Sequence, residues 1–140
     1  MYSNLLKEKN IKITKNRILL LETIEKLNKV FNVDDIYESL KNNNHKINIS
    51  TIYRNVNTFY ENDILDKITE VNGIIYYQLQ KETHLHYLIC TQCNQIIPLK
   101  ECPLEEIENN LSKKTGYTIE SHNLEFRGIC PKCNKNKKDI

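Results

Sequence analysis

The chain has 140 residues and a mass of 16.6 kDa, enough for one compact domain or two small ones and too little for a large enzyme. Hydrophobic residues make up 39% and charged residues 27%, which is ordinary for a folded globular protein and excludes a disordered chain. The formal net charge of +2 is too small to indicate a nucleic-acid partner by itself.

The N-terminal segment has neither the apolar core nor the small-residue cleavage site of a secretory signal peptide. The longest apolar runs, such as residues 18–21, are too short to cross a bilayer. Both features predict a cytoplasmic protein, and thiols stay reduced in that compartment. The five cysteines are therefore expected to bind metal rather than to form disulfides.

Three helices are predicted in the first half of the chain, each with a residue that can cap its first turn. Thr14 and Asn32 can accept hydrogen bonds from the free N–H groups of the first two helices, and apolar residues recur behind both at helical spacing. Ser50 is expected to open the third helix, which has one apolar face. The other face of this helix carries polar side chains, namely Thr51, Arg54 and Asn57.

Two β-rich segments, residues 65–71 and 74–79, follow these helices and are separated by Asn72-Gly73. This dipeptide tolerates positive φ at both positions, which a tight two-residue hairpin turn requires. Three helices followed by a hairpin predict a winged helix-turn-helix, a DNA-binding fold. We place this domain at residues 1–82.

Two stretches of this domain contain basic residues and no acid. Residues 9–21 include Lys15 and Arg17, and residues 39–60 include Arg54. Such stretches can be ordinary solvent-exposed surface. A DNA-binding surface also needs basic side chains without nearby acids, because they neutralise the phosphates.

Residues 83–140 are predicted to form a small α/β domain, which makes the whole chain an α+β protein. Pro103 suits the first position of a helix, and Gly116 suits a left-handed position at its end. The lysine-rich tail is expected to be frayed. In chain order, the predicted elements are a strand, a strand, a helix and a strand, at residues 84–89, 95–99, 103–116 and 117–129.

Four of the five cysteines form two Cys-x-x-Cys pairs, Cys90 with Cys93 and Cys130 with Cys133. The two-residue gap lets both thiolates of a pair point at one ion, and two pairs complete a tetrahedral shell of sulfurs that selects zinc. Because four protein ligands leave no open coordination position, this zinc is expected to be structural. A redox dithiol is the alternative, but neither pair lies in the βαβ setting of a thioredoxin-like motif.

A second metal site is predicted from three histidines and one acid. His84 and His86 share a face of their predicted strand, and Glu105 lies in the first turn of the next helix. The cysteine pairs are expected to join the ends of the first and last strands, which would bring His122 close to His84 and His86. The three imidazoles and the carboxylate can then hold zinc or Fe2+. Alternatively, the histidines bind no metal, and Glu105 only stabilises the start of its helix through a favourable interaction with the helix dipole. Cys102 stands alone and is expected to be a packed or idle thiol.

Several motifs keep a distinctive order along the chain, namely Ile49-Ser50-Thr51-Ile52-Tyr53-Arg54-Asn55-Val56, the hairpin, His84-x-His86-x3-Cys90-x2-Cys93 and Cys130-x2-Cys133. In type and order they resemble the ferric uptake regulator family of metal-dependent bacterial repressors, over nearly the whole chain. That family includes sensors of iron, zinc, manganese, nickel and peroxide. The resemblance implies a winged-helix DNA-binding domain, a dimerisation domain, and a homodimer that binds a palindromic operator in double-stranded DNA when metal-loaded.

The resemblance also implies roles for particular residues. Cys90, Cys93, Cys130 and Cys133 correspond to the structural zinc site of the family, and His84, His86, Glu105 and His122 to a second metal site in the dimerisation domain. Thr51, Tyr53 and Arg54 fall on the recognition helix, and Lys15 falls where a basic side chain approaches the minor groove. The candidates for DNA binding are these four residues together with Arg17 and Asn57.

One departure concerns a further sensing site that many members of the family have between their two domains. The corresponding positions here are Val30, Gln78, Leu85, Tyr87 and Pro98. Val, Leu and Pro have no side-chain ligand atom, and Gln and Tyr are weak substitutes. The departure argues against a peroxide sensor that works by iron oxidation.

The sequence thus predicts a metal-responsive transcriptional repressor that acts as a homodimer and is not an enzyme. One alternative is a constitutive DNA-binding regulator whose zinc sites are purely structural. The other is a zinc enzyme, which would need a three-ligand site with an open water position. Imidazole suits both zinc and Fe2+, but a site with only one carboxylate favours zinc and a protein similar to the zinc uptake regulators.

Overall fold

A computed structural model describes residues 2–80, 86–99 and 102–138. The chain divides into two compact units, Met1–Gln80 and Lys81–Ile140. The boundary expected between residues 82 and 83 lies outside the described residues. Among the described helices, none is long and apolar enough to span a membrane.

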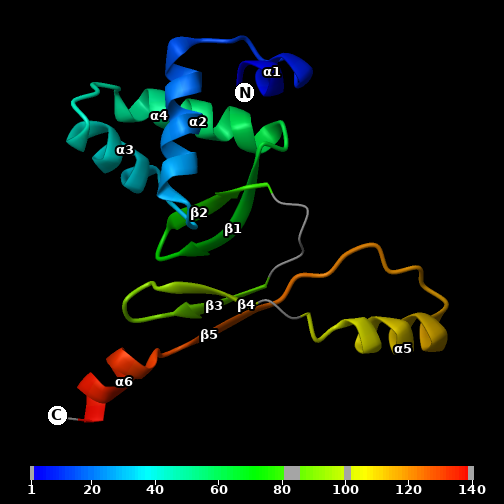
Figure 1. Cartoon of the computed structure of the whole chain (residues 1–140). Coiled ribbons are helices and arrows are strands. Elements are labelled where there is room, and N and C mark those ends of the chain that lie inside the picture. The colour runs from blue at the N-terminus through cyan, green and yellow to red at the C-terminus, as the bar shows by residue number, and fades with distance from the viewer. Residues whose placement is uncertain (1, 81–85, 100–101, 139–140) are drawn as a thin grey trace. The chain divides into compact units, whose positions relative to one another are not determined.

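The first unit contains four helices followed by a two-stranded hairpin, which is the winged helix-turn-helix expected from the sequence (Figure 1). Only the short first helix was not expected. The hairpin strands have the predicted bounds. The elements are α1 (Tyr2–Glu8), α2 (Lys15–Leu27), α3 (Val33–Asn42), α4 (Ile49–Glu61), β1 (Leu65–Val71) and β2 (Ile74–Leu79).

Side-chain caps determine where these helices begin. Thr14 accepts a hydrogen bond from the backbone N–H of Arg17, as expected for the cap of α2. Asn32 and Asp35 form a reciprocal capping box at the start of α3, because each side chain accepts a bond from the backbone N–H of the other. The cap of α4 is Asn48, not Ser50, since the Asn48 side chain reaches the N–H of Ser50 and starts the helix earlier.

The turn between β1 and β2 has the predicted left-handed conformation, with φ of 53° at Asn72 and 79° at Gly73. The hairpin is tied to the helices by a short bridge between Phe31 and Tyr77, whose backbone groups exchange hydrogen bonds of 2.9 and 2.7 Å. The wing is therefore held at the N-terminal end of α3.

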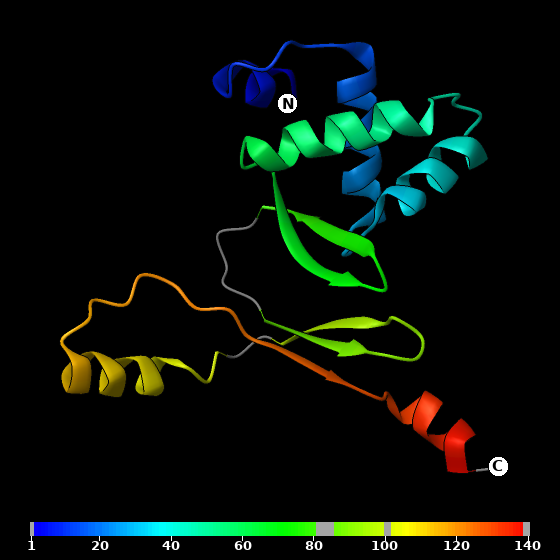
Figure 2. The same ribbon diagram turned by 180° about the vertical axis from the view of Figure 1, so that it is seen from behind.

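The core of the first unit lies among its helices and the base of the hairpin. Helix α4 lies across α2 (Figure 2) and buries Ile52, Val56 and Phe59, which recur at helical spacing. Leu20 and Leu21 of α2 are fully buried as well. Because one face of α4 is used in this way, its opposite face is left for solvent or a ligand.

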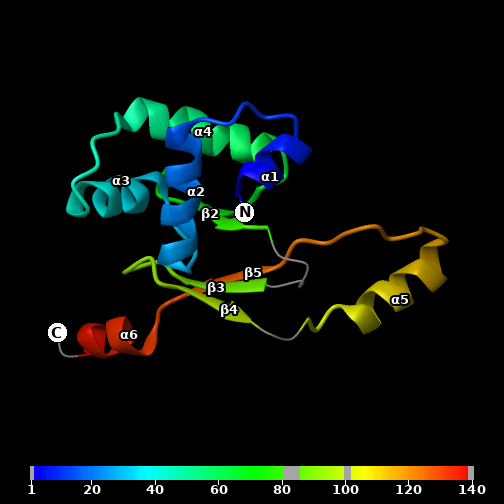
Figure 3. The same cartoon turned by 45° about the horizontal axis from the view of Figure 1, so that its top comes forward.

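The second unit is a three-stranded sheet with one helix in the connection between β4 and β5 and one after β5 (Figure 3). The central strand pairs antiparallel with β4 and parallel with β5. Helices α5 and α6 lie at opposite ends of this sheet in all three views. The elements are β3 (His86–Cys90), β4 (Ile96–Leu99), α5 (Glu105–Thr115), β5 (Glu125–Gly128) and α6 (Pro131–Lys138).

Three local expectations for this unit were wrong. The final strand is short, because only residues 125–128 pair with β3, while residues 116–124 have no regular structure. The described part of the lysine-rich tail, residues 135–138, is helical and belongs to α6 instead of being frayed. Pro103 precedes α5 instead of opening it, although Gly116 ends the helix with the expected positive φ of 77°.

The second unit buries few side chains. Among its described residues, the buried ones are His86, Tyr87, Ile89 and Cys90, all on β3. Helix α5 has no buried residue. Burial on this scale is small compared with the conformational entropy that folding removes, so this unit needs another source of stability.

We expect Asn32→Ala to lower the free energy of unfolding of the first unit by about 1 kcal/mol, because the free N–H group of Asp35 loses its acceptor at the start of α3. Urea denaturation followed by circular dichroism measures the change. Glu38→Ala, at an exposed position of the same helix, is the control and should shift stability by less than about 0.5 kcal/mol. Equal effects of the two substitutions would contradict the capping role.

Candidate metal centres and nucleic-acid interface

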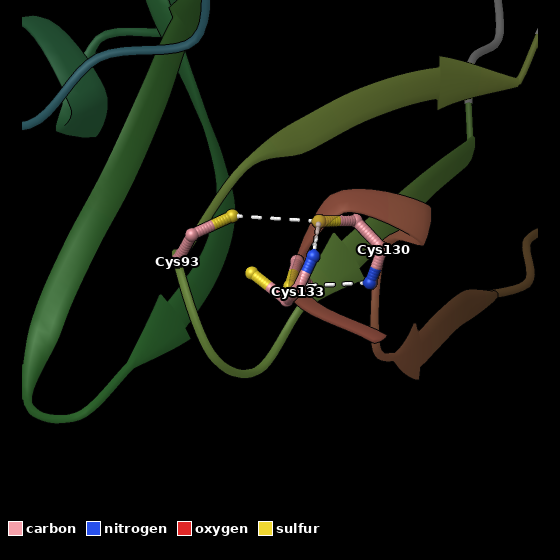
Figure 4. Close-up of side chains that lie close together, drawn as sticks. Cys93, Cys130 and Cys133 are labelled. Atoms are coloured by element: carbon pink, nitrogen blue, oxygen red, sulfur yellow. Dashed lines mark hydrogen bonds between the residues drawn. The ribbon is translucent and has the colours of Figure 1, made fainter. Parts of the chain in front are cut away.

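Four cysteine sulfurs converge at one end of the sheet in the second unit. Cys90 is the last residue of β3, and its Cα is paired with that of Gly128 at the end of β5. Cys93 lies in the turn after β3, while Cys130 and Cys133 lie at the start of α6 (Figure 4). The four sulfurs lie within 4.8 Å of one another. The parallel pairing of β3 with β5 therefore brings both Cys-x-x-Cys pairs together.

The geometry of this cluster suits a tetrahedral zinc ion. The sulfurs of Cys93 and Cys130 are 3.9 Å apart. Two sulfurs each about 2.3 Å from a central ion lie about 3.8 Å apart in a tetrahedron. The backbone N–H of Cys130 also points at the Cys90 sulfur, at 3.4 Å, and that of Cys133 points at the Cys130 sulfur at the same distance. Such bonds orient sulfurs around an ion.

The protonation of these thiols also favours a cation. Hydrogen bonds from backbone N–H groups, that of Cys130 first, lower the pKa of Cys90 to about 6. The neighbouring sulfur of Cys130 raises the pKa of Cys133 to about 12. Four close sulfurs thus do not all ionise at neutral pH on their own, and a divalent ion supplies the charge that allows it.

A second cluster joins His86, Cys102 and His122, whose ligand atoms also lie within 4.8 Å of one another. His86 is the first residue of β3, Cys102 precedes α5 and His122 follows it. The Nε2 atoms of the two histidines are 3.0 Å apart. The Cys102 sulfur lies 3.2 Å from Nε2 of His86 and 3.4 Å from Nε2 of His122. The Nδ1 atom of His122 contacts a carboxylate oxygen of Glu108 on α5.

This second cluster overlaps only in part with the one expected from the sequence. The structure brings His86 and His122 together, while His84 lies outside the described residues. Glu105 is exposed and does not join the cluster. Sequence reasoning missed Glu108, although it lies three residues after Glu105 and so shares its helix face. It also left Cys102 aside, and no spacing motif in the sequence marks that residue.

The exposed face of α4 carries the side chains expected to read DNA. Tyr53 is 56% exposed, and Arg54 and Asn57 are exposed as well. The guanidinium of Arg54 lies 3.4 Å from the hydroxyl oxygen of Thr51, which is half-buried. A groove of about 390 Å³ runs between this face and the hairpin turn at Gly73. The helix and the wing therefore line one continuous surface.

The two basic candidates on α2 differ in their surroundings. Lys15 is exposed. Arg17 is half-buried and donates hydrogen bonds to the Asn55 side chain at 3.0 Å and to the carbonyl of Lys12 at 2.6 Å. Arg17 therefore links α2 to α4 and helps to hold the exposed face of α4 in place.

Comparisons with known proteins all indicate the same family. The model of the family described as "Ferric uptake regulator family" matches residues 8–127. The ferric uptake regulation protein of Bacillus subtilis (strain 168) is 33% identical over 104 residues, which cover 72% of this chain and 70% of that protein. The peroxide operon regulator of the same organism is 28% identical over 130 residues, covering 93% and 89%.

A solved structure is similar over most of the chain. It is that of the ferric uptake regulator from Francisella tularensis with iron, and the TM-score is 0.82 at 26% identity. The match covers 89% of this chain and 95% of that one.

We expect Cys133→Ser to remove the zinc that survives mild chelation, about one ion per chain, because three remaining thiolates hold the ion much less tightly than four. Elemental analysis after dialysis against a weak chelator measures the bound zinc. Cys102→Ser is the matched control and should keep this ion, since Cys102 is not among the four sulfurs. A Cys133→Ser protein that retained its zinc would contradict the assignment.

Proposed function

Because the chain belongs to the ferric uptake regulator family, we propose that it represses transcription as a homodimer that binds a palindromic DNA operator when its regulatory site holds a metal ion. The chain is a transcription regulator and not an enzyme. We further propose that residues 1–82 are the DNA-binding domain and residues 83–140 the dimerisation domain. Repression would take place in the cytoplasm, where DNA is accessible and thiols stay reduced.

The exposed face of α4 is the observation that carries the proposal for DNA binding. Tyr53, Arg54 and Asn57 project from a helix whose other face is buried in the core, as a recognition helix in the major groove requires. Thr51 completes this reading surface, and Lys15 adds a positive charge that neutralises phosphate. We include Arg17 as a phosphate contact that also holds α2 against α4.

We propose that Cys90, Cys93, Cys130 and Cys133 hold a permanent structural zinc. The convergence of their sulfurs and the small number of buried side chains in the second unit support this role. Where a domain has little core, the free energy of metal binding becomes free energy of folding. The zinc would thus keep β3, β5 and α6 together.

The proposed sensor is the second metal site, for which the sequence gives His84, His86, Glu105 and His122. The closeness of His86 and His122 supports it. His84 comes directly after the segment that links the two domains, so a metal that fixes its ring would restrict the angle between them. To shift a chain from about 1% to about 99% DNA-competent, the metal must favour the competent form by about 5 kcal/mol.

An exposed apolar row supports the proposed homodimer. Leu88, Ile97 and Phe126 are Cα partners across the three strands of the second unit and are 39%, 41% and 48% exposed. Ile107 and Leu111, one helical turn apart on α5, are also about half exposed. A second copy of the chain would cover apolar surface that a monomer leaves in water.

The sensed metal is proposed to be zinc rather than Fe2+. Relatives include both a ferric uptake regulation protein and a peroxide operon regulator, so family membership alone does not select the metal. Gln78, Tyr87 and Pro98 occupy positions where many members have ligands of another site, which argues against a peroxide sensor. A constitutive DNA-binding regulator is the alternative function.

We expect the unsubstituted protein to bind its DNA about 100-fold more tightly with the second site filled than empty, because the DNA-competent fraction rises from about 1% to nearly all of the protein. A duplex selected from a randomised pool by the zinc-loaded protein serves as the probe, and fluorescence anisotropy measures its affinity. His86→Ala should remove the dependence on added zinc. Arg54→Ala, the matched control, should weaken binding at every zinc concentration and leave zinc content unchanged.

Two outcomes of this experiment would count against the proposal. Zinc dependence that survives His86→Ala would overturn the sensor assignment. Equal affinity of the unsubstituted protein with and without added zinc would favour the constitutive alternative instead.

We expect Leu88→Glu combined with Phe126→Glu to raise the dissociation constant of the homodimer by at least about 30-fold, which corresponds to the loss of about 2 kcal/mol at the centre of an interface. Analytical ultracentrifugation measures the constant. Ile13→Glu is the control, because Ile13 is 47% exposed and belongs to the first unit, not to the proposed dimerisation domain. A double variant that stayed as dimeric as the control would rule out this surface.

A further inference from the structure

We propose that Cys102 is a ligand of the regulatory site together with His86 and His122, and that its thiolate makes this site prefer zinc to iron or manganese. The inference rests on the proposed function, because it concerns the metal site that we propose as the sensor. It changes the expected ligand set, in which Cys102 had no role.

The distances among the three ligand atoms fit one tetrahedral ion. With about 2.05 Å from zinc to nitrogen and about 2.3 Å from zinc to sulfur, a tetrahedral shell has nitrogen–nitrogen edges of about 3.3 Å and nitrogen–sulfur edges of about 3.5 Å. The corresponding edges here are 3.0 Å between the histidines, and 3.2 and 3.4 Å from the Cys102 sulfur to His86 and His122. An ion would expand the triangle only slightly.

The surroundings of His122 match those of a metal-bound imidazole. Its Nε2 atom faces the sulfur and the other histidine, while its Nδ1 atom contacts the carboxylate of Glu108. Metal-binding histidines commonly donate their second N–H to a carboxylate, which fixes the ring and leaves the other nitrogen free to bind the ion. Glu108 is thus a positioning residue for His122.

The origin and burial of the members of this cluster favour a metal site over a chance cluster. Its three ligands come from the start of β3, the segment before α5 and the segment after it, and His86 is only 3% exposed. The Cys102 thiol is a weak donor and a weak acceptor, so its hydrogen bonds to the two nearby Nε2 atoms stabilise the cluster only weakly. A cation interacts favourably with all three groups at once.

The chemistry of the thiolate determines the expected selectivity. Thiolate is a soft ligand that suits zinc, whereas carboxylate and water suit manganese better, and imidazole suits zinc and iron alike. Metal binding displaces the thiol proton of Cys102 to solvent and forms the sulfur–metal bond. Glu105, the acid in the expected set, is exposed and lies outside the cluster. We therefore expect the zinc preference to depend on Cys102 and not on Glu105.

The test uses the full-length protein with its four-cysteine zinc in place and titrates the second site with Zn2+ against a chromophoric chelator. Cys102→Ser should weaken zinc binding by about 100-fold or more, since losing a ligand exceeds the 10- to 100-fold effect of losing an outer-shell partner. It should change Mn2+ affinity by less than about 10-fold, because manganese gains little from a thiolate. With Co2+ in the second site, the thiolate-to-cobalt charge-transfer absorption should disappear in the variant.

Glu106→Gln, at an exposed position of α5 with no assigned role, is the matched control and should leave zinc affinity and the cobalt spectrum unchanged. Glu105→Gln tests the acid of the expected ligand set and should weaken zinc binding far less than Cys102→Ser does. Unchanged zinc affinity in Cys102→Ser would overturn the inference, as would a loss confined to Glu105→Gln. These measurements contain no DNA, so a protein without metal-dependent DNA binding could still pass them. In that case the proposed function would fail while the ligand assignment held.

A second measurement covers the possibility that Cys102→Ser does not fold. In the unsubstituted protein, Cys102 should be protected from alkylation when Zn2+ fills the second site and reactive when Mn2+ replaces it. Mass spectrometry of the digested protein locates the modified cysteines. Equal reactivity of Cys102 in the two metal forms would overturn the inference without any variant.

Discussion

The convergence of four cysteine sulfurs is the constraint on which the second unit depends. Cys90 ends β3 and Cys93 follows it, while Cys130 and Cys133 follow β5, so one cluster joins two strands that are separated in sequence by β4 and α5. Closing so long a connection costs entropy, and the few buried side chains of β3 do not offset it. A metal ion bound by both pairs would supply the missing free energy.

The same pairing of strands also positions the second cluster. Tyr87 on β3 is the partner of Glu125 on β5, so the segment just before β5 brings His122 to the side of His86. His86 is the first residue of β3 and Cys90 the last. One short strand therefore contributes to both clusters, and whatever stabilises the four-cysteine end also holds the geometry of the histidine end. One small unit could therefore hold both the proposed permanent zinc and the proposed exchangeable metal.

The first unit was largely predictable because its signals are local. Thr14 and Asn32 cap helices through bonds to residues three positions away, and Asn72-Gly73 needs only its own backbone conformation. The predictions were wrong where two neighbouring residues could both cap a helix, or where contacts between distant residues set the length of an element. Asn48 displaced Ser50 as a cap, since both side chains can accept such a bond. The final strand ends up short because only the part beside β3 has a partner.

The sequence by itself determined the α+β fold class, the four-cysteine set and the polar face of α4, since each follows from spacing between near neighbours. Only the tertiary structure decided which groups meet the histidines. Glu105 and Glu108 lie three residues apart on one helix face, so spacing cannot choose between them, and Glu108 contacts His122 because of where the chain returns after α5. Cys102 has no motif at all. Its place beside His86 follows from the antiparallel pairing of β3 with β4, in which Leu99 is the partner of His86, and His122 joins them through the pairing of β3 with β5. Sequence periodicity does not encode these pairings.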